Sequence, residues 1–198
     1  PDLCSQLYVY VTDGNNGLVS LKLVAVTSTL TYFNRIAITG FVEDVFKSIK
    51  IDNFLFLASG TAGLRVVKIQ DPENLISGGY CDTPGYASNV MYYGGYVYVA
   101  DGLGGVQVVN WDANASPPSP IISAYDTPGL ASRMSWAEGY IMLADYSALR
   151  VINASTPTAP SEVTTAAFES PTVPEKAAAV DSTVYLVDPY QGLRIFDV

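Results

Sequence analysis

The chain has 198 residues, of which 49% are hydrophobic and 15% are charged, and this composition excludes intrinsic disorder because it supplies ample material for a core. Its formal net charge is −9, and its 10 Lys and Arg residues are scattered singly, which argues against a nucleic-acid partner. No apolar run approaches the roughly 20 residues of a membrane-spanning helix, so we expect no transmembrane segment. The chain opens at Pro1 without a signal-peptide pattern, which indicates a mature, trimmed or fragmentary chain.

One hairpin pattern recurs along the chain. In its clearest copy, the run Tyr96-Val97-Tyr98-Val99 has the β-branched and aromatic residues that favour a strand, Asp101-Gly102 ends it, and a second strand resumes at Val106. The spacing of the copies lies in the range of roughly 40 to 50 residues that is typical of one four-stranded propeller blade. The copies begin at Tyr8, Phe54, Tyr96, Tyr140 and Thr183.

Repeats of one type from end to end favour a single closed array over two domains. We therefore predict an all-β fold with one domain over residues 1–198, a five-bladed β-propeller built from repeats of about 43 residues. The last blade is incomplete because no outer strand follows its third strand. The approximate blades are 1–43, 44–85, 86–129, 130–172 and 173–198.

Each blade should hold an inner, a second, a third and an outer strand. The second strands begin at the five positions above, and residues 24–33 of the first blade replace the short link between its third and outer strands. Predicted inner strands are 45–51, 87–93, 131–137 and 176–181, with a stub at 2–6. Predicted third strands are 18–23, 64–69, 105–111, 148–153 and 192–197. Predicted outer strands are 35–40, 75–81, 120–125 and 160–168.

Matching corners follow the outer strands of the second and third blades, at Asp82-Thr83-Pro84-Gly85 and Asp126-Thr127-Pro128-Gly129. Pro followed by Gly predicts a type II turn, since Pro fixes the first central dihedral and Gly accepts a positive φ at the second. A degenerate copy, Glu169-Ser170-Pro171-Thr172, follows the fourth blade.

These third strands and corners resemble the LVIVD repeat. The resemblance rests on Asp-Gly before the third strand, Tyr-Asp-Thr-Pro-Gly after it, and the strands Leu64-Arg65-Val66-Val67-Lys68, Leu149-Arg150-Val151-Ile152-Asn153 and Leu193-Arg194-Ile195-Phe196-Asp197. It extends over nearly the whole chain, and the first blade departs from it most. The resemblance implies a β-propeller, usually on secreted or surface proteins of bacteria and archaea, and it implies no common catalytic activity.

Two kinds of charged residue recur at fixed positions of the repeat. Aspartates end four of the second strands, and we interpret them as turn caps, because a ring of blades would hold them too far apart to share a Ca²⁺ ion. Arginines recur in three third strands, where a guanidinium commonly ties strands together. The aspartates are Asp13, Asp101, Asp145 and Asp188, with Ser59 in the remaining copy; the arginines are Arg65, Arg150 and Arg194, with Val19 and Gln107 in the other two.

We predict no catalytic residue, no metal site and no cofactor. The chain has no histidine to act as a general base, and its carboxylates follow the turn pattern. One alternative stays open: two carboxylates facing an axial channel would be the arrangement that glycoside hydrolysis requires.

The composition also favours a location outside the cytoplasm, at the cell surface or beyond it. Lys and Glu are few, Ser, Thr, Tyr and Asn are frequent, and two acceptor tripeptides for N-glycosylation begin at Asn114 and Asn153. Both asparagines should lie in surface loops just after third strands, where a glycan has room. The alternative is that both are polar turn residues of a repeated template.

The two cysteines, Cys4 and Cys81, are assigned to the inner stub of the first blade and to the outer strand of the second. Positions some three strand spacings apart are separated by about 14 Å, beyond the limit of ~7 Å between Cα atoms for a disulfide. We therefore predict free thiols or a disulfide between chains, and the extracytoplasmic setting favours the second.

From these observations we predict that the chain is a non-catalytic structural protein that self-assembles into a filament, sheath or surface layer. The third strand of the last blade has an open edge, and open edges recruit strands. The strand could come from residues 1–6 or 23–33 of a neighbouring molecule. Two alternatives remain: a secreted binding or adhesion module for a glycan or protein ligand, and a hydrolase or lyase with a carboxylate site in the channel.

Overall fold

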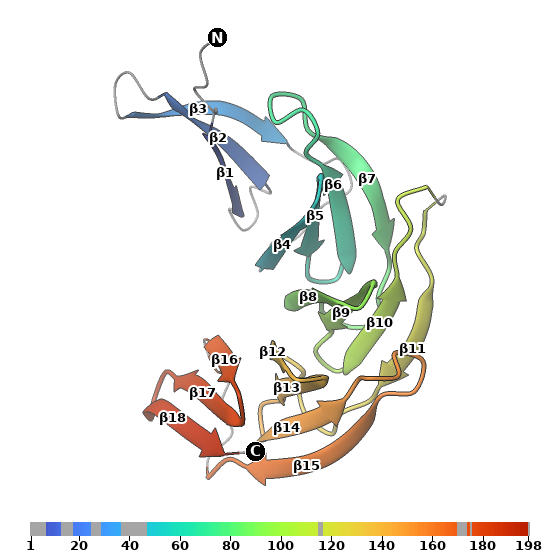
Figure 1. Ribbon diagram of the computed structural model, residues 1–198, viewed down its shortest axis with the longest axis vertical. Helices are drawn as coiled ribbons and strands as arrows, with labels where there is room; N and C mark the ends of the chain where they lie inside the picture. The colour runs from blue at the N-terminus through green and yellow to red at the C-terminus, as the bar shows by residue number, and fades with distance from the viewer. Residues whose placement is uncertain are drawn as a thin grey trace.

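The computed structural model describes residues 7–12, 18–24, 29–36, 47–114, 117–169, 174 and 176–197. Within these ranges all strands belong to antiparallel sheets, five in number, and there is no helix, so none that could span a membrane (Figure 1). The all-β prediction is therefore confirmed.

Each sheet is a meander in which strands that follow one another in sequence are hydrogen-bonded neighbours. The first sheet has three strands: β1 (Leu7–Thr12), β2 (Leu18–Val24) and β3 (Thr29–Ile36). The second has four: β4 (Lys47–Ile51), β5 (Phe54–Ala58), β6 (Leu64–Lys68) and β7 (Ile76–Cys81). The third has β8 (Asn89–Tyr93), β9 (Tyr96–Ala100), β10 (Val106–Asn110) and β11 (Ile121–Tyr125). The fourth has β12 (Arg133–Ala137), β13 (Tyr140–Ala144), β14 (Ala148–Asn153) and β15 (Ser161–Ala167), and the fifth β16 (Lys176–Val180), β17 (Thr183–Asp188) and β18 (Gly192–Asp197).

The five sheets follow one another along an arc (Figure 1). Their inner strands line the concave side, where β4 contacts β8, β8 contacts β12 and β12 contacts β16. The outer strands β3, β7, β11 and β15 lie on the convex side. The first and fifth sheets form the two ends of the arc, and between these ends the arc is open.

Four hydrophobic clusters fill the spaces between consecutive sheets, and among the described residues none joins the first sheet to the fifth. The middle strands contribute to a cluster on both of their faces. In β9, for example, Val97 and Val99 pack toward the second sheet, whereas Tyr98 and Ala100 pack toward the fourth. This explains why these strands are continuously apolar, as the sequence predicts for a sheet that is covered on both sides.

Within the described residues, predicted strands lie within two residues of their observed bounds, except the outer strand of the first sheet. The inner stub predicted at 2–6 lies outside the described residues. The outer strand of the first sheet was expected at 35–40, and the structure places β3 at Thr29–Ile36, paired with β2. The run of Thr, aromatic and aliphatic residues that was interpreted as a longer link therefore forms the strand itself, in keeping with its β propensity. Residues 29–33 thus pair with β2 of their own sheet. The donation of 23–33 to a neighbouring molecule stays a prediction.

The type II assignment of the Pro-Gly corners is also wrong, because Gly85 and Gly129 do not have a positive φ. Glycine is needed there for a different reason. A Cβ at Gly129 would overlap the backbone carbonyl oxygen of Asp145, and a Cβ at Gly85 would overlap that of Asp101. Each corner thus passes directly against the end of a second strand.

Candidate functional site

The buried aspartate that ends β13 is a turn cap and an ion-pair partner. Asp145 is fully buried and accepts hydrogen bonds from the backbone N–H groups of Ala148, at 2.9 Å, and Ser147, at 3.3 Å. Its other oxygen pairs with the guanidinium of Arg150. In the fifth sheet Asp188 accepts from the N–H groups of Tyr190 and Gln191 at 2.8 and 3.1 Å. Both carboxylates therefore hold the hairpin between the second and third strands, as the capping interpretation predicts.

Asp101 occupies the equivalent position in the third sheet but holds the preceding corner. It accepts a hydrogen bond from the Thr83 hydroxyl at 2.5 Å and one from the Gly85 N–H at 2.7 Å. Burial raises the pKa of Asp101, and these two hydrogen bonds act against that rise. The carboxylate thus joins the corner between the second and third sheets to the end of β9. Asp13 lies outside the described residues.

The recurring arginines all have structural partners. Arg150 pairs with Glu162 at 2.7 Å in addition to Asp145, and Tyr125 donates to the same Glu162 at 2.9 Å from the neighbouring sheet. The hydrogen bond from Arg150 lowers the pKa of Glu162, and burial together with Glu162 raises the pKa of Tyr125 to about 12.

The other two arginines combine an ion pair with an aromatic contact. Arg65 donates to Asp82 at 2.9 Å and lies 5.0 Å from the ring centroid of Tyr80. Arg194 lies 4.7 Å from the ring centroid of Phe168, and its Nη1 is 3.8 Å from Asp188. Through these contacts the two arginines join neighbouring strands. Gln107, which replaces Arg in the third sheet, donates to the Gly104 carbonyl at 2.5 Å, and Val19 lies in β2.

A mainly apolar cavity of about 510 Å³ lies between the corner that precedes β8 and the corner that precedes β12. Tyr86 and Leu130 occupy the same place after Pro-Gly in the two corners, and Leu103 reaches the cavity from the turn between β9 and β10. All three side chains are exposed. Arg133 lines one wall and donates to the Ser132 carbonyl at 3.1 Å. The cavity could hold an aromatic or aliphatic group, with the guanidinium beside it.

Sequence reasoning missed this cavity. The signal that could have found it is the repeated pair Gly85-Tyr86-Ala87-Ser88 and Gly129-Leu130-Ala131-Ser132, in which an apolar residue follows each corner glycine. A large apolar residue that recurs beside a turn, away from the strand pattern, marks a surface cluster.

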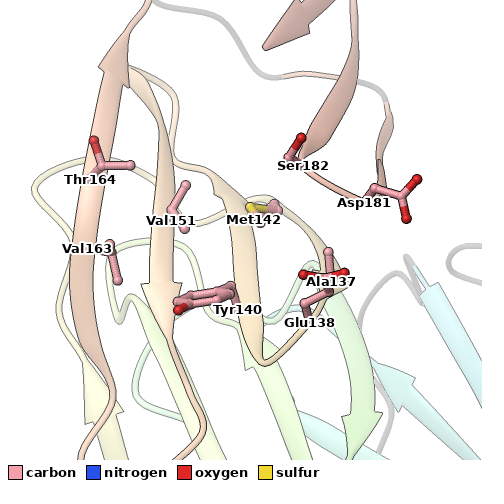
Figure 2. Close-up of a pocket in the computed structure, with 9 residues that line it drawn as sticks. All are labelled: Ala137, Glu138, Tyr140, Met142, Val151, Val163, Thr164, Asp181 and Ser182. Carbon is pink, nitrogen blue, oxygen red and sulfur yellow. The ribbon is translucent and has the colours of Figure 1, made fainter. Parts of the chain in front are cut away.

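A second cavity of about 250 Å³ lies between the fourth and fifth sheets (Figure 2). Tyr140, Met142 and Val151 line its floor, and two carboxylates stand at its border, Glu138 and Asp181. Each carboxylate begins a two-residue turn with a positive φ, 48° and 51°, and both side chains are exposed. In Figure 2 the Asp181 carboxylate points away from the other labelled side chains. Asp181 is therefore explained by its turn, in which aspartate is common, and Glu138 occupies the equivalent turn position in the fourth sheet.

The cavity itself is an incompletely filled contact between sheets. Tyr140 and Met142 occupy the register positions of Phe54 and Phe56 in the second sheet. There the indole of Trp111 fills the corresponding space, with ring centroids 5.6 Å from Phe54 and 5.3 Å from Phe56. Within the described ranges, no group of three or more His, Cys, Asp or Glu side chains could hold a metal ion.

The two predicted glycosylation positions differ in their surroundings. Asn114 lies in an exposed turn after β10, where its backbone N–H donates to Asp112 at 2.8 Å. Asn153 is the last residue of β14 instead of a loop residue, and its side-chain oxygen accepts from the Ser155 N–H and hydroxyl at 2.9 and 2.7 Å. Asn114 has the more open position for a glycan, and glycosylation of both stays a prediction.

Cys81 is buried in the cluster between the second and third sheets, as a free thiol at the end of β7, and Cys4 lies outside the described residues. Burial raises the pKa of the Cys81 thiol to about 11. A disulfide between chains through Cys81 would require this cluster to open, because the sulfur is covered by the core.

We expect Cys81 to resist alkylation in the folded protein. At pH 8 the thiol is almost entirely protonated and is shielded by the core, whereas only the thiolate reacts. Iodoacetamide labelling of a Cys4→Ser variant should be slower by at least about a hundredfold in buffer than in 6 M urea, given the thiol's raised pKa and its burial. Mass spectrometry after timed quenching measures both rates. Equal rates would contradict the placement of Cys81 in the core.

Comparison with known proteins agrees with the fold. The model of the LVIVD repeat matches residues 5–21, which include β1, and residues 84–126, which include the whole third sheet. The match is narrower than the motifs predict, since it leaves out the third strands of the second, fourth and fifth sheets. A search of curated proteins finds no match.

Three solved structures are similar over most of the chain. The computationally designed Ika8 protein has a TM-score of 0.64 at 10% identity, over 96% of this chain and 57% of that one. The designed Ika4 protein has a TM-score of 0.60 at 9% identity, over 78% of this chain and 91% of that one. A putative 6-phosphogluconolactonase from Bacteroides uniformis has a TM-score of 0.69 at 13% identity, over 92% of this chain and 60% of that one. The chain thus spans little more than half the length of two of these proteins, and the low identities show the fold alone. With the motifs of the sequence and the match of the family model in agreement, the chain carries the LVIVD repeat at residues 5–21 and 84–126.

Proposed function

We propose that this chain is a non-catalytic structural module made of five β-propeller blades, which assembles with copies of itself outside the cytoplasm into a filament, sheath or surface layer. One observation carries the proposal. Among the described residues, the side chains of Leu193 and Ile195 on β18 are each 61% exposed, beside the exposed Val187 of β17. An exposed apolar face of this kind is a site of association.

The architecture supports the propeller assignment. Each repeat forms one meander, the inner strands lie side by side on the concave side, and each contact between sheets has its own hydrophobic cluster. The recurring charged side chains are engaged in turns and ion pairs, which leaves the apolar end of the arc as the surface best suited to a partner.

The proposal predicts that the purified chain forms species larger than a monomer and that their size rises with protein concentration. Size-exclusion chromatography with light scattering measures this, and electron microscopy of the native material would show whether the species are filaments or layers. Removing residues 1–6 tests whether that segment is the donated strand: smaller species are expected if it is. A wild-type chain that stays monomeric at high concentration would refute self-assembly.

A second candidate function is a binding module for a glycan or protein ligand. The observation that favours it is the cavity lined by Tyr86, Leu103 and Leu130, since an exposed aromatic ring can stack on a sugar. A monomeric protein that binds a ligand in this cavity would favour that function over assembly. The likeness to a putative 6-phosphogluconolactonase keeps a hydrolase as a third candidate, which would need a pair of acids acting together on a substrate.

A further inference from the structure

Contacts between neighbouring sheets follow one register. We call the face of a sheet that packs on the next sheet along the chain its trailing face, and the opposite face its leading face. On trailing faces, a residue of the second strand pairs across the ladder with one of the third, and both are buried. The equivalent pairs are Phe56 with Val66, Tyr98 with Val108, and Met142 with Val151.

The trailing face of the fifth sheet repeats this arrangement without a partner. Tyr185 pairs with Ile195 at the same place in the register, and Val187 pairs with Leu193 next to it. Tyr185 is 38% and Ile195 61% exposed, whereas each of their six counterparts is at most 6% exposed. Val180 on β16 extends the exposed surface inward. Four aliphatic side chains and one tyrosine thus form a blade contact that nothing covers in the described part of the chain.

The leading face of the first sheet is the matching half. Val9 and Val11 occupy the positions of Val97 and Val99 in the third sheet, which are fully buried against the second sheet. Val9 is 38% and Val11 39% exposed. They pair across the ladder with Leu21 and Val19, so this face is also apolar at its centre. Its other side, with Leu18 and Tyr10, packs on the second sheet in the usual way.

From these two faces we propose that a second copy of this chain binds head to tail. The leading face of the second copy's first sheet packs on the trailing face of the first copy's fifth sheet. The contact continues the series of four blade contacts already present within the chain, with apolar pairs on both sides and no charged side chain in the central pairs. This inference rests on the proposed self-assembly and names its surface. The two faces are different, so the contact is heterologous and produces a filament unless its rotation closes a ring.

The two faces could instead meet within one chain, which would require the arc to close on itself. A crosslinking experiment separates the two cases. In a Cys4→Ser, Cys81→Ala background, Val9→Cys is introduced in one preparation and Ile195→Cys in another, with tags of different size. A short bismaleimide crosslinker should join the mixed preparations into a heterodimer. Either preparation alone should give little dimer, because each carries only one half of the contact. Val9→Cys mixed with Leu103→Cys is the matched control, since Leu103 is exposed on a turn away from both faces.

A chain that carries both Val9→Cys and Ile195→Cys gives the decisive result. Head-to-tail binding yields a ladder of crosslinked multimers, whereas closure within one chain yields an internally crosslinked monomer and overturns the proposal. In parallel, Ile195→Lys and Val9→Lys should each weaken association at least about tenfold, the effect of losing one central contact. Both sites are exposed, so the thermal midpoint of the monomer should hardly change. If wild type assembles but neither the Lys variants nor the crosslinks respond, this contact is refuted while self-assembly stands. A monomeric wild type refutes both.

Discussion

Replacing Arg150 with Met is expected to lower the free energy of unfolding by about 3 kcal/mol, the low end of what breaking a buried ion pair costs. Arg150 neutralises the fully buried Asp145 and also holds Glu162. The substitution keeps much of the apolar stem but leaves the Asp145 carboxylate buried without its counter-charge. The N–H groups of Ser147 and Ala148 still reach this carboxylate, which is why the loss should not be larger.

The same variant should change how stability depends on pH. The pKa of Glu162 is lowered in the folded state from its usual 4.5, chiefly by the hydrogen bond from Arg150. A lowered folded pKa means that this group's contribution is fully present above pH 4.5 and is lost as the pH falls through the folded value. Without Arg150, the decrease in the free energy of unfolding that Glu162 causes at low pH should disappear. Urea unfolding at pH 7 and at several values below pH 5 measures both effects.

Arg65→Met is the matched control for this experiment. Arg65 occupies the equivalent position in the second sheet, but its partner Asp82 is 69% exposed. An exposed ion pair contributes about 1 kcal/mol or less, so the control should lose much less stability than Arg150→Met. Equal losses in the two variants would contradict the assignment of a buried pair to Arg150.

Gly129→Ala is the second substitution with a large expected effect, a loss of about 3 kcal/mol or failure to fold, since overpacking against backbone has no cheap relief. The added Cβ would overlap the carbonyl oxygen of Asp145, to which the N–H of Leu130 donates at 2.9 Å. Either the corner or the end of β13 must move. Both contact Asp145, which forms the ion pair with Arg150.

Gly78→Ala serves as its control. Gly78 also lacks a positive φ and is half-buried, and its Cβ would meet the side chains of Lys68 and Val66 at 3.2 and 3.3 Å and the Lys68 backbone nitrogen at 3.4 Å. These contacts are much longer than the overlap at Gly129, so a smaller loss of about 1 kcal/mol is expected. Thermal and urea unfolding of both variants make the comparison. A Gly129→Ala protein as stable as the control would show that the corner does not pass against Asp145 as described.

The strands and their order could be predicted from the sequence because the signals are local. A run such as Tyr96-Val97-Tyr98-Val99 followed by Asp-Gly determines a strand and a turn within a dozen residues, and the repeat transfers that assignment to the other copies. The turn-capping role of Asp145 and Asp188 and the structural role of the three arginines follow from the same repetition. In the first sheet, where the repeat departs most from its pattern, β3 was placed wrongly, since no neighbouring copy indicated its register.

Other features depend on contacts between segments that are distant in the sequence, and only the tertiary structure decided them. The glycine of each Pro-Gly corner is required by the backbone carbonyl of an aspartate 16 residues further on, which an added Cβ at Gly85 or Gly129 would overlap, and not by its own φ. The burial of Cys81 depends on the third sheet covering it. Tyr185 and Ile195 have the residue types of a buried pair. They are exposed because no sheet packs on the fifth sheet's outer face in the described part of the chain. Local patterns determine each sheet, whereas contacts between sheets that are distant in the sequence determine which faces are covered.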